Sequence, residues 1–475
     1  ETRIYKFDSS LVSPSVTDTH GTTNMVKETT KVHGGDVTIL TSATTTVAPA
    51  LPLQEHRLPL SNLDLLLPPI DVGVFFCYLH PAPTAAALKE ALAKVLVAYY
   101  PLAGEVVANA DGEPEVLCSG CGVEFTEATT EDAELRELRL GMVDESVEML
   151  VPAKKAGVIS VQVTKFRCGG AVVGCTFDHR VCDAYSFNMF LVAWAAASRG
   201  GSAPHAPCFR RSLVAPRDPS PRTHSTDALI DRLFSPLSSA PPPPPASVAA
   251  TAVNRIYHIA AADVKALQAR AGPGRTKLEA FTAHLWQLSS RAASEHQSLC
   301  CMGMVVDGRA RMSPDGAMEA YFGNVLTITY GVIGAGDLRR RMALADVADD
   351  VHRWVREAAT GDHFWGLVDW VEALRPKPAQ ARAYLGGTGG AEATSCIVSS
   401  GMGFPIAEAD FGTGVPAFAS YHFPWPAGAA YVMPMPSARG DGDWVVYVHA
   451  APELVNVMEE EHSVFKALEN SYVFG

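Results

Sequence analysis

The sequence predicts an α/β protein built from two domains of mixed sheet and helices. The chain has 475 residues, which is more than one hydrophobic core usually organises. Runs with strand character alternate with runs of helical periodicity in both halves of the chain. Between the halves, residues 201–250 carry two proline-rich stretches, the second at Pro241–Pro245, and these favour an extended crossover.

The first predicted domain covers residues 36–200 and follows a polar tail at residues 1–35. Thr84 is expected to cap a helix, because its hydroxyl can accept a hydrogen bond from a free amide of the first turn. Ile159, Val161 and Val163 alternate with polar residues, which predicts a half-buried strand. The other expected elements are a strand at Val37–Ala48, the helix continuing to about Tyr99, an apolar strand at Ala171–Phe177 and a helix that begins after Asp183.

The second predicted domain covers residues 251–475 and repeats this mixed pattern. The expected strands are Arg255–Ile259, Met302–Val306 and Trp444–Val448, and the expected helices are Ala261–Arg270, Lys277–Arg291 and Leu344–Val355. A large ligand would bind most naturally where two such domains meet.

Charge and composition exclude several classes of function. The formal net charge is -13, so nucleic acid and anionic membrane surfaces are poor partners. No apolar run has the length of a membrane span. The ten cysteines include several inside apolar runs, which favours free thiols in a reducing compartment. Cys118 and Cys121 form a lone CxxC without a second pair, so no metal site is expected. We therefore expect a cytoplasmic protein.

The most informative chemical feature is the segment from Phe177 to Asp183. A buried strand is expected to end there and a helix to begin, with His179 at the junction. A histidine is mostly neutral near pH 7, so it can accept a proton from an attacking alcohol. The alternative is a core histidine without a catalytic role, since a chain with 15 histidines can show one H-x-x-x-D by chance.

A second feature is the segment Asp410-Phe411-Gly412-Thr413-Gly414. Its two glycines suit a tight turn or a close backbone approach. Taken alone, this pattern predicts a turn rather than a site.

Together these segments resemble the BAHD family of plant acyl-CoA-dependent acyltransferases. The family's H-x-x-x-D is matched by His179 to Asp183, and its D-F-G-W-G by Asp410 to Gly414, with Thr413 in place of Trp. The resemblance extends from about Val37 to the C-terminus and is closest to the branch of coniferyl alcohol acyltransferase and shikimate O-hydroxycinnamoyltransferase. The flanking matches are Leu60–Asp64, Tyr100–Gly104, Val306–Arg309 and Tyr321–Asn324.

The resemblance implies two domains similar to chloramphenicol acetyltransferase, with a tunnel between them. His179 would be the general base, and Asp183 would pair with Arg309 and hold the His179 loop. Asp410, Gly412 and Gly414 would maintain the architecture of the second domain, away from the reacting centre. Thr413 leaves the oxyanion donor open, because the Trp at this place in relatives can line the tunnel.

The resemblance also implies acyl-coenzyme A as co-substrate, with no permanently bound cofactor. Thr276 and Lys277 open a predicted helix, whose N-terminal amides favour phosphate. Relatives contact coenzyme A near this position, and Ser399 and Ser400 match a segment along the pantetheine arm. The alternative for each of these residues is a helix cap or a surface polar group. Relatives are usually monomers, and the same is expected here.

The function implied is transfer of an acetyl or hydroxycinnamoyl group from the thioester to a hydroxyl of a phenylpropanoid-type alcohol such as coniferyl alcohol. Three alternatives stay open at this stage. The acceptor can be an amine, and the protein can be a weakly active member that binds acyl-CoA or a phenolic compound. The acyl group can also pass through Cys182 or Ser186, which lie close to His179 in sequence.

Overall fold

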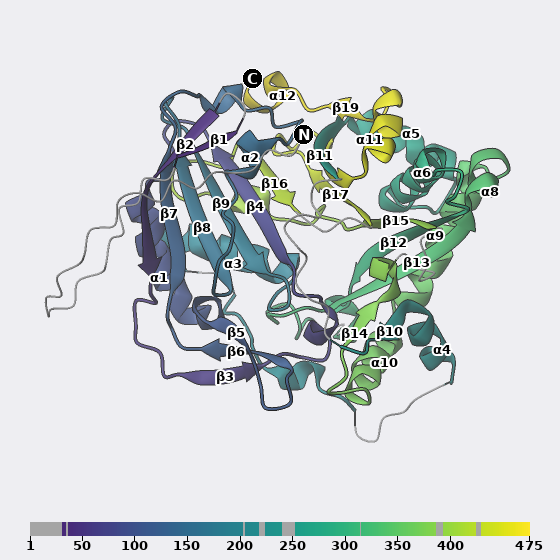
Figure 1. Ribbon diagram of the computed structural model, residues 1–475, viewed down its shortest axis with the longest axis horizontal. Helices are drawn as coiled ribbons and strands as arrows, with labels where there is room; N and C mark the ends of the chain where they lie inside the picture. Colours follow the sequence, from purple (N-terminus) through teal and green to yellow (C-terminus); the bar gives the residue numbers. More distant parts are fainter. Residues whose placement is uncertain are drawn as a thin grey trace, which may run out of the picture.

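The computed structural model describes residues 31–34, 37–202, 205–217, 224–239, 252–313, 315–385, 393–423 and 429–475. Residues 1–30 of the expected tail and Pro241–Pro245 lie outside these ranges. Two large mixed sheets stand side by side, one drawn in purple and blue on the left of Figure 1 and one in green and yellow on the right. The two-domain acyltransferase-like α/β class predicted from sequence is confirmed.

The first sheet orders its strands β1-β2-β7-β8-β9-β4-β16, with β7 and β8 parallel. Lys31–Gly34 pairs with the next strand, so the sheet begins inside the predicted tail. Phe418–His422, from the second half of the chain, pairs with β4 and completes the other edge. The strands are β1 Lys31–Gly34, β2 Val37–Val47, β4 Asp71–Tyr78, β7 Val123–Thr129, β8 Ile159–Lys165, β9 Ala171–Asp178 and β16 Phe418–His422.

Both faces of β8 and β9 are covered. The apolar run of β9 is buried throughout, as expected. The prediction of a half-buried β8 is wrong, because its polar residues are buried as well. Gln162, for example, donates to the carbonyl of Met149 and to Thr164 Oγ1. The segment around Met149 covers the face that the alternating pattern assigned to solvent.

The second sheet orders its strands β13-β12-β15-β17-β18-β11-β19. β15 runs parallel to β12 and to β17. A three-stranded sheet, β3-β6-β5, extends the first half. The strands are β11 Val253–Ile259, β12 Leu299–Asp307, β13 Leu326–Gly334, β15 Ala393–Val398, β17 Ala430–Pro436, β18 Trp444–Ala450 and β19 Lys466–Ala467, with β3 His56–Pro59, β5 Glu105–Ala108 and β6 Pro114–Cys118.

Helices cover the outer sides of both sheets (Figure 1). Thr84 caps the first helix as predicted, and Trp194 Nε1 donates to Leu88 O at 2.9 Å, which joins α3 to α1. Among the described residues, no helix has the length and apolar character of a membrane span. The helices are α1 Ala85–Ala98, α2 Glu145–Glu148, α3 Ala184–Ser198, α4 His224–Leu233, α5 Ala261–Ala271, α6 Lys277–Ala292, α7 Arg309–Met312, α8 Ala335–Arg340, α9 Leu344–Ala358, α10 Gly361–Glu372, α11 Pro452–Glu460 and α12 Asn470–Phe474.

The crossover is more structured than its prolines predicted. It contains α4 and the short strand β10 (Phe234–Pro236), which pairs with β14 (Ala379–Ala381). Ile230, Leu233 and Phe234 are buried, and Trp370 Nε1 donates to Asp231 Oδ1 at 2.9 Å. The crossover therefore packs on the second half, because Ile230 and Leu233 share one face of α4 and Phe234 of β10 is buried beside them.

Candidate active site

A cavity of about 380 Å³ lies between the two halves and receives residues from both. β9, its following turn and α3 form one wall, and β12, β13, β17 and the segment after β15 form the other. Seven aromatic side chains dominate the lining, and the polar groups are few, as in most small-molecule sites. The aromatic residues are Phe177, Tyr185, Phe234, Tyr384, Phe404, Phe423 and Tyr431, and the polar ones include His179, Asp183, Asp307, Thr327, Ser399 and Ser400.

His179 is held in a turn between two regular elements. β9 ends at Asp178, and Asp183 caps α3 by accepting from Ser186 N at 2.9 Å. The backbone N–H of His179 donates to Ile70 O at 3.0 Å. The strand end thus delivers the imidazole to the cavity wall, while the cap fixes where the helix starts.

Within the described ranges of the chain, Nδ1 of the imidazole has a hydrogen-bond partner and Nε2 has none. Nδ1 of His179 lies 3.1 Å from Oδ1 of Asn324. The amide nitrogen of Asn324 donates to the carbonyl of His179 at 2.9 Å and to Asp64 Oδ1 at 3.0 Å, which assigns the orientation of the amide. Oδ1 can only accept, so Nδ1 carries the proton and Nε2 keeps its lone pair.

Burial keeps this base unprotonated. The His179 side chain is buried, and desolvation lowers the pKa of His179 below its ordinary value near 6.5, although Asp183 and the bond to Asn324 act in the opposite direction. A neutral imidazole with a free Nε2 can accept a proton at pH 7.

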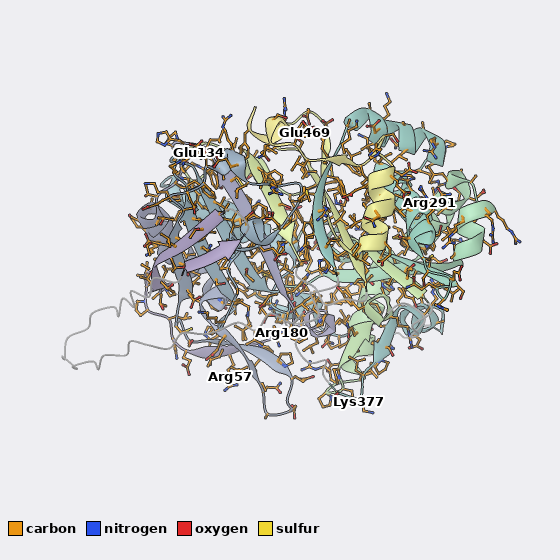
Figure 2. All side chains as sticks on the ribbon, turned by 45° about the horizontal axis from the view of Figure 1, so that its top comes forward. Arg57, Glu134, Arg180, Arg291, Lys377 and Glu469 are labelled. Carbon is orange, nitrogen blue, oxygen red and sulfur yellow. The ribbon has the colours of Figure 1, made fainter. Side chains whose placement is uncertain are left out.

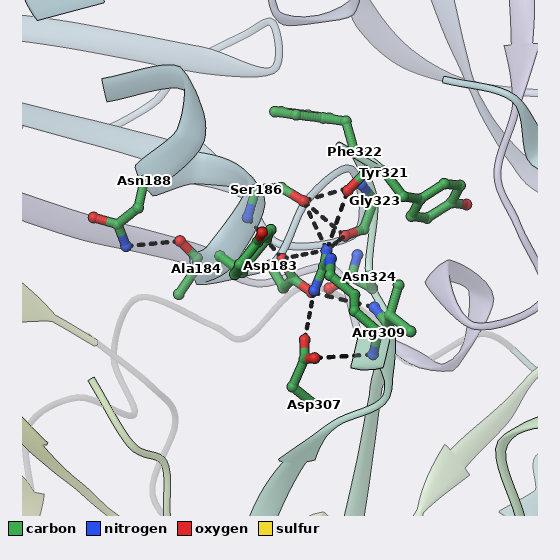
Figure 3. A network of polar contacts seen from close by, with 12 residues as sticks. Asp183, Ala184, Ser186, Asn188, Asp307, Arg309, Tyr321, Phe322, Gly323 and Asn324 are labelled. Carbon is green, nitrogen blue, oxygen red and sulfur yellow. Dashed lines mark hydrogen bonds and ion pairs between the residues drawn. The ribbon is translucent and has the colours of Figure 1, made fainter. Parts of the chain in front are cut away.

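Asp183 forms a buried ion pair with Arg309 (Figure 3). Its two oxygens accept from the guanidinium of Arg309 at 2.8 and 3.0 Å, and the two side chains are 1% and 4% exposed. Asp183 also accepts from the backbone N–H groups of Ser186 and Val325. In the described part of the chain, no hydrogen bond joins Asp183 to His179. The predicted Asp183–Arg309 contact is present, and its geometry suits a positioning role.

Neither neighbour of His179 is prepared as a nucleophile. Burial and nearby carboxylates raise the pKa of the Cys182 thiol well above its ordinary value, which disfavours the thiolate. The Ser186 hydroxyl donates to Gly323 O at 2.9 Å and accepts from Arg309 Nη2 and Gly323 N. The geometry therefore disfavours a covalent intermediate at either residue.

The Asp410–Gly414 segment lies at the opposite end of α3 from His179. Asp410 Oδ1 accepts from Gly412 N at 2.8 Å and Gly414 N at 2.9 Å, and both glycines have positive φ, of 100° and 106°. The carbonyl of Asp410 accepts from Arg199, just beyond α3. Since α3 has 15 residues, this loop stands about 20 Å from the His179 end. It holds onto the first half of the chain, whereas the resemblance implied a role in the second.

Thr413 does not line the cavity. The resemblance left the oxyanion donor open because the Trp of relatives can line the tunnel, whereas residue 413 of this chain lies outside the cavity lining. The hydroxyl of Thr413 is buried and makes no hydrogen bond within the described residues.

The expected coenzyme A residues divide into two groups. Ser399 and Ser400 line the cavity, but Thr276 and Lys277 do not. Thr276 caps α6 by accepting from Glu279 N at 3.1 Å, and the Glu279 carboxylate accepts from Thr276 N at 2.7 Å. The Glu279 carboxylate already occupies the positive end of the helix, which weakens the case for a phosphate there.

Sequence reasoning gave no role to Asn324 or Asp64. Both stand in runs that the family resemblance marked, Tyr321–Asn324 and Leu60–Asp64. Each run ends on a polar side chain, and this was the available signal. Both side chains are fully buried, where an unpaired polar group is costly.

A second cavity, of about 440 Å³, adjoins the first. Leu67 lines both cavities, and Arg180 faces the second while its neighbour His179 faces the first. Arg180 and Lys377, labelled in Figure 2, both line the second cavity. The two cavities therefore lie side by side, with His179 lining one and Arg180 lining the other.

A protein-family model described as Transferase family matches residues 36–464. Since it covers most of the chain, the chain belongs to this transferase family, the BAHD acyltransferases. Solved structures with a related fold include vinorine synthase, with a TM-score of 0.68, 22% identity and coverage of 91% of this chain and 100% of that one. Another is F. sporotrichioides TRI101 complexed with coenzyme A and T-2, with a TM-score of 0.69, 16% identity and coverage of 86% and 99%.

Curated relatives act in hydroxycinnamoyl transfer. The hydroxycinnamoyl-CoA:5-hydroxyanthranilate N-hydroxycinnamoyltransferase of Avena sativa is 30% identical over 446 residues, covering 86% of this chain and 96% of its own length. Putrescine hydroxycinnamoyltransferase 1 of Oryza sativa subsp. japonica is 30% identical, with coverage of 86% and 94%. Shikimate O-hydroxycinnamoyltransferase of Nicotiana tabacum is 28% identical, with coverage of 88% and 97%.

Proposed function

We propose that this protein transfers a hydroxycinnamoyl-type acyl group from its coenzyme A thioester to a small hydroxyl- or amine-bearing acceptor, with His179 as general base. The observation that carries this proposal is the free Nε2 of a buried, neutral His179 on the wall of an aromatic-lined cavity. An aromatic acyl group suits that lining better than an acetyl group, because rings pack well against rings.

The reaction follows from this geometry in two steps. His179 Nε2 takes the acceptor's proton while the acceptor oxygen or nitrogen attacks the thioester carbonyl. The tetrahedral intermediate then breaks its carbon–sulfur bond, and the protonated His179 returns its proton to the leaving thiolate. Because no protein nucleophile holds the acyl group, donor and acceptor must be bound together. Ser399 and Ser400 would contact the donor, and Thr276 and Lys277 are retained as weaker candidates for coenzyme A.

Two observations keep an amine among the acceptors. Two of the relatives named above, each 30% identical to this chain, carry an amine in their names, 5-hydroxyanthranilate in one and putrescine in the other. The Asp307 carboxylate also lines the cavity, and although each of its oxygens accepts one hydrogen bond from Arg309, lone pairs remain for an ammonium or hydroxyl group. The cysteines inside apolar runs favour a reducing, cytoplasmic compartment, and a monomer is proposed because the family resemblance implies one.

The test is a matrix of donors and acceptors with free-thiol detection and mass analysis of the product. p-Coumaroyl-CoA and acetyl-CoA are each combined with coniferyl alcohol, shikimate, 5-hydroxyanthranilate and putrescine. We expect turnover with the aromatic donor, intersecting double-reciprocal lines and no acylated protein when the acceptor is absent. Tight binding of the donor without turnover on any acceptor would instead identify a binding protein. A stoichiometric acyl adduct on Cys182 or Ser186, formed and discharged at the turnover rate, would replace the direct mechanism.

A further inference from the structure

A buried carboxylate from a distant segment stands directly behind the Asn324–His179 pair. Asp64, at the start of a short 3-10 helix (Asp64–Leu66), is fully buried. Its Oδ1 accepts from Asn324 N at 2.6 Å and Asn324 Nδ2 at 3.0 Å. Its Oδ2 accepts from Ser61 N at 2.8 Å and Ser61 Oγ at 2.7 Å. Both oxygens are thus occupied by donors.

These contacts leave only one orientation for the Asn324 amide. Its NH₂ group faces three oxygens, which are Asp64 Oδ1, the carbonyl of His179 and the carbonyl of Arg180. A flipped amide would place its own oxygen against those three and its NH₂ against His179 Nδ1. The carboxylate of Asp64 therefore decides which amide atom meets the imidazole, and so which imidazole nitrogen keeps the proton.

Arg211 of the crossover supplies the compensating positive charge. Its Nη2 lies 3.6 Å from Asp64 Oδ2, and its Nη1 donates to Tyr321 Oη at 2.8 Å and Phe322 O at 2.7 Å. The packing is close, since a Cβ at Gly323 would stand 2.7 Å from Arg211 Nη1 and 3.3 Å from Asp64 Oδ1. Arg211 thereby joins the crossover to the two segments that hold the base.

We propose that Asp64 is a positioning residue that sets the tautomer and orientation of His179 through Asn324, with Arg211 as its counter-ion. This inference rests on the proposed function, in which His179 Nε2 is the base. Loss of a tautomer-setting carboxylate in serine hydrolases lowers kcat by up to about 10⁴ with the geometry intact. Because Asp64 acts through an intervening amide, we expect Asp64→Asn to lower kcat by at least about tenfold.

The first measurement is the tautomer of His179 in the free protein, by ¹⁵N NMR of histidine-labelled enzyme. It needs no substrate, so its outcome is separate from that of the proposed acyl transfer. We expect the Nδ1–H form in the wild type and a mixture with Nε2–H in Asp64→Asn. An unchanged Nδ1–H form in that variant would overturn the proposal.

Kinetics then separate positioning from simple structural support. In Asp64→Asn, kcat should fall while KM for the acyl-CoA stays unchanged, and the acidic limb of kcat/KM should move to lower pH, because a negative charge near the imidazolium is lost. The matched control is Asp369→Asn, another buried carboxylate, paired with Arg217 at 2.6 Å. Asp369→Asn should lower the free energy of unfolding and leave the acidic limb of kcat/KM at its wild-type pH. Equal behaviour of the two variants would contradict positioning.

A double-mutant cycle tests the route through Asn324. Asn324→Ala should lower kcat by at least as much as Asp64→Asn, and adding Asp64→Asn to it should cost little more, because the link is already broken. If the double variant instead lowered kcat by the product of the two single effects, Asp64 would act by another route, and the proposal would be overturned. Should Asp64→Asn not fold, Asn324→Ala carries the test alone, and a wild-type kcat and acidic limb in that variant would overturn it.

Discussion

The two sequence motifs of this family lie at opposite ends of α3 and make different contacts there. At the N-terminal end, Asp183 caps the helix and pairs with Arg309, beside the cavity that His179 faces. At the C-terminal end, Ser198 Oγ donates to Phe411 O at 2.9 Å, and Phe411 packs edge-on against Trp194. The N-terminal end of α3 lies beside the cavity, and its C-terminal end holds a loop of the second half on the first half.

The Asp410–Gly414 loop at the C-terminal end of α3 connects the two halves of the molecule. It leads from the second half of the chain into β16, which completes the first sheet against β4. The positive φ of Gly412 and Gly414 lets the chain turn there, and Asp410 holds the turn through two backbone amides. Two motifs of equal prominence in the sequence thus have different surroundings, since one lies beside the cavity and the other joins the second half to the first sheet.

The largest expected effect comes from removing the base. His179→Ala should lower turnover by about 10²–10⁴, because it removes the general base that takes the proton from the attacking hydroxyl or amine. The matched control is His284→Ala, a buried histidine of α6 that stacks on Phe465. That variant should lose stability but keep its kcat. Near-normal turnover by folded His179→Ala protein would remove His179 from the mechanism.

Next in size is the buried ion pair. Asp183→Ala removes the more buried of the two carboxylates that pair with Arg309 and leaves Asp307 at 2.6 Å, so it should cost up to roughly 3–5 kcal/mol of unfolding free energy, with loss of activity. Replacing both residues by apolar ones should recover part of that stability. Denaturant unfolding of the single and double variants decides the matter. Unchanged stability with lost activity in Asp183→Ala would assign Asp183 to proton transfer instead.

The pH dependence should show the effect of burial on the base. The reaction requires neutral His179, and burial lowers the pKa of His179, so kcat/KM should stay high on acidification until the pH is below about 6.5. An acidic limb above that value would contradict a desolvated base.

Stability must be followed in parallel with those rates. Burial lowers the pKa of His284, His363 and His422 to about 4 in the folded protein. Between pH 6.5 and 4 the unfolded state binds more protons at these residues, so stability should fall as pH falls through that window. Stopped assays at each pH with thermal unfolding curves distinguish this loss from titration of the base.

A smaller effect is expected at the other end of α3. Asp410→Ala removes two hydrogen bonds to backbone amides in a partly exposed turn and should cost about 1–2 kcal/mol. Its kcat should stay near that of the wild type, since the loop is about 20 Å from His179. A large fall in kcat at full stability would show that this end also takes part in the reaction.

The smallest effect is expected at Thr413. Thr413→Trp should change acceptor preference by less than about twofold, because this side chain does not line the cavity. Phe404→Ala, within the cavity, is the matched control and should raise KM for aromatic substrates. A clear change of acceptor preference in Thr413→Trp would place residue 413 in the substrate path.

Local order was readable in the sequence. The strand that ends before His179, the turn and the helix capped by Asp183 follow from periodicity and capping, which act over a few residues. The helix capped by Thr84 was predicted for the same reason. The crossover is more ordered than its prolines predict, because Ile230 and Leu233 follow helical spacing and are buried.

Tertiary structure decided how distant segments meet. Asn324 lies 145 residues from His179 and 260 from Asp64, yet the three side chains share one buried hydrogen-bonded group. The entry of β16 into the first sheet and the position of Thr413 outside the cavity are equally non-local. The family resemblance marked Asn324 and Asp64 without assigning them a role. Which imidazole nitrogen keeps its proton depends on partners that only packing brings together, because the sequence specifies each segment's own periodicity but not its neighbours.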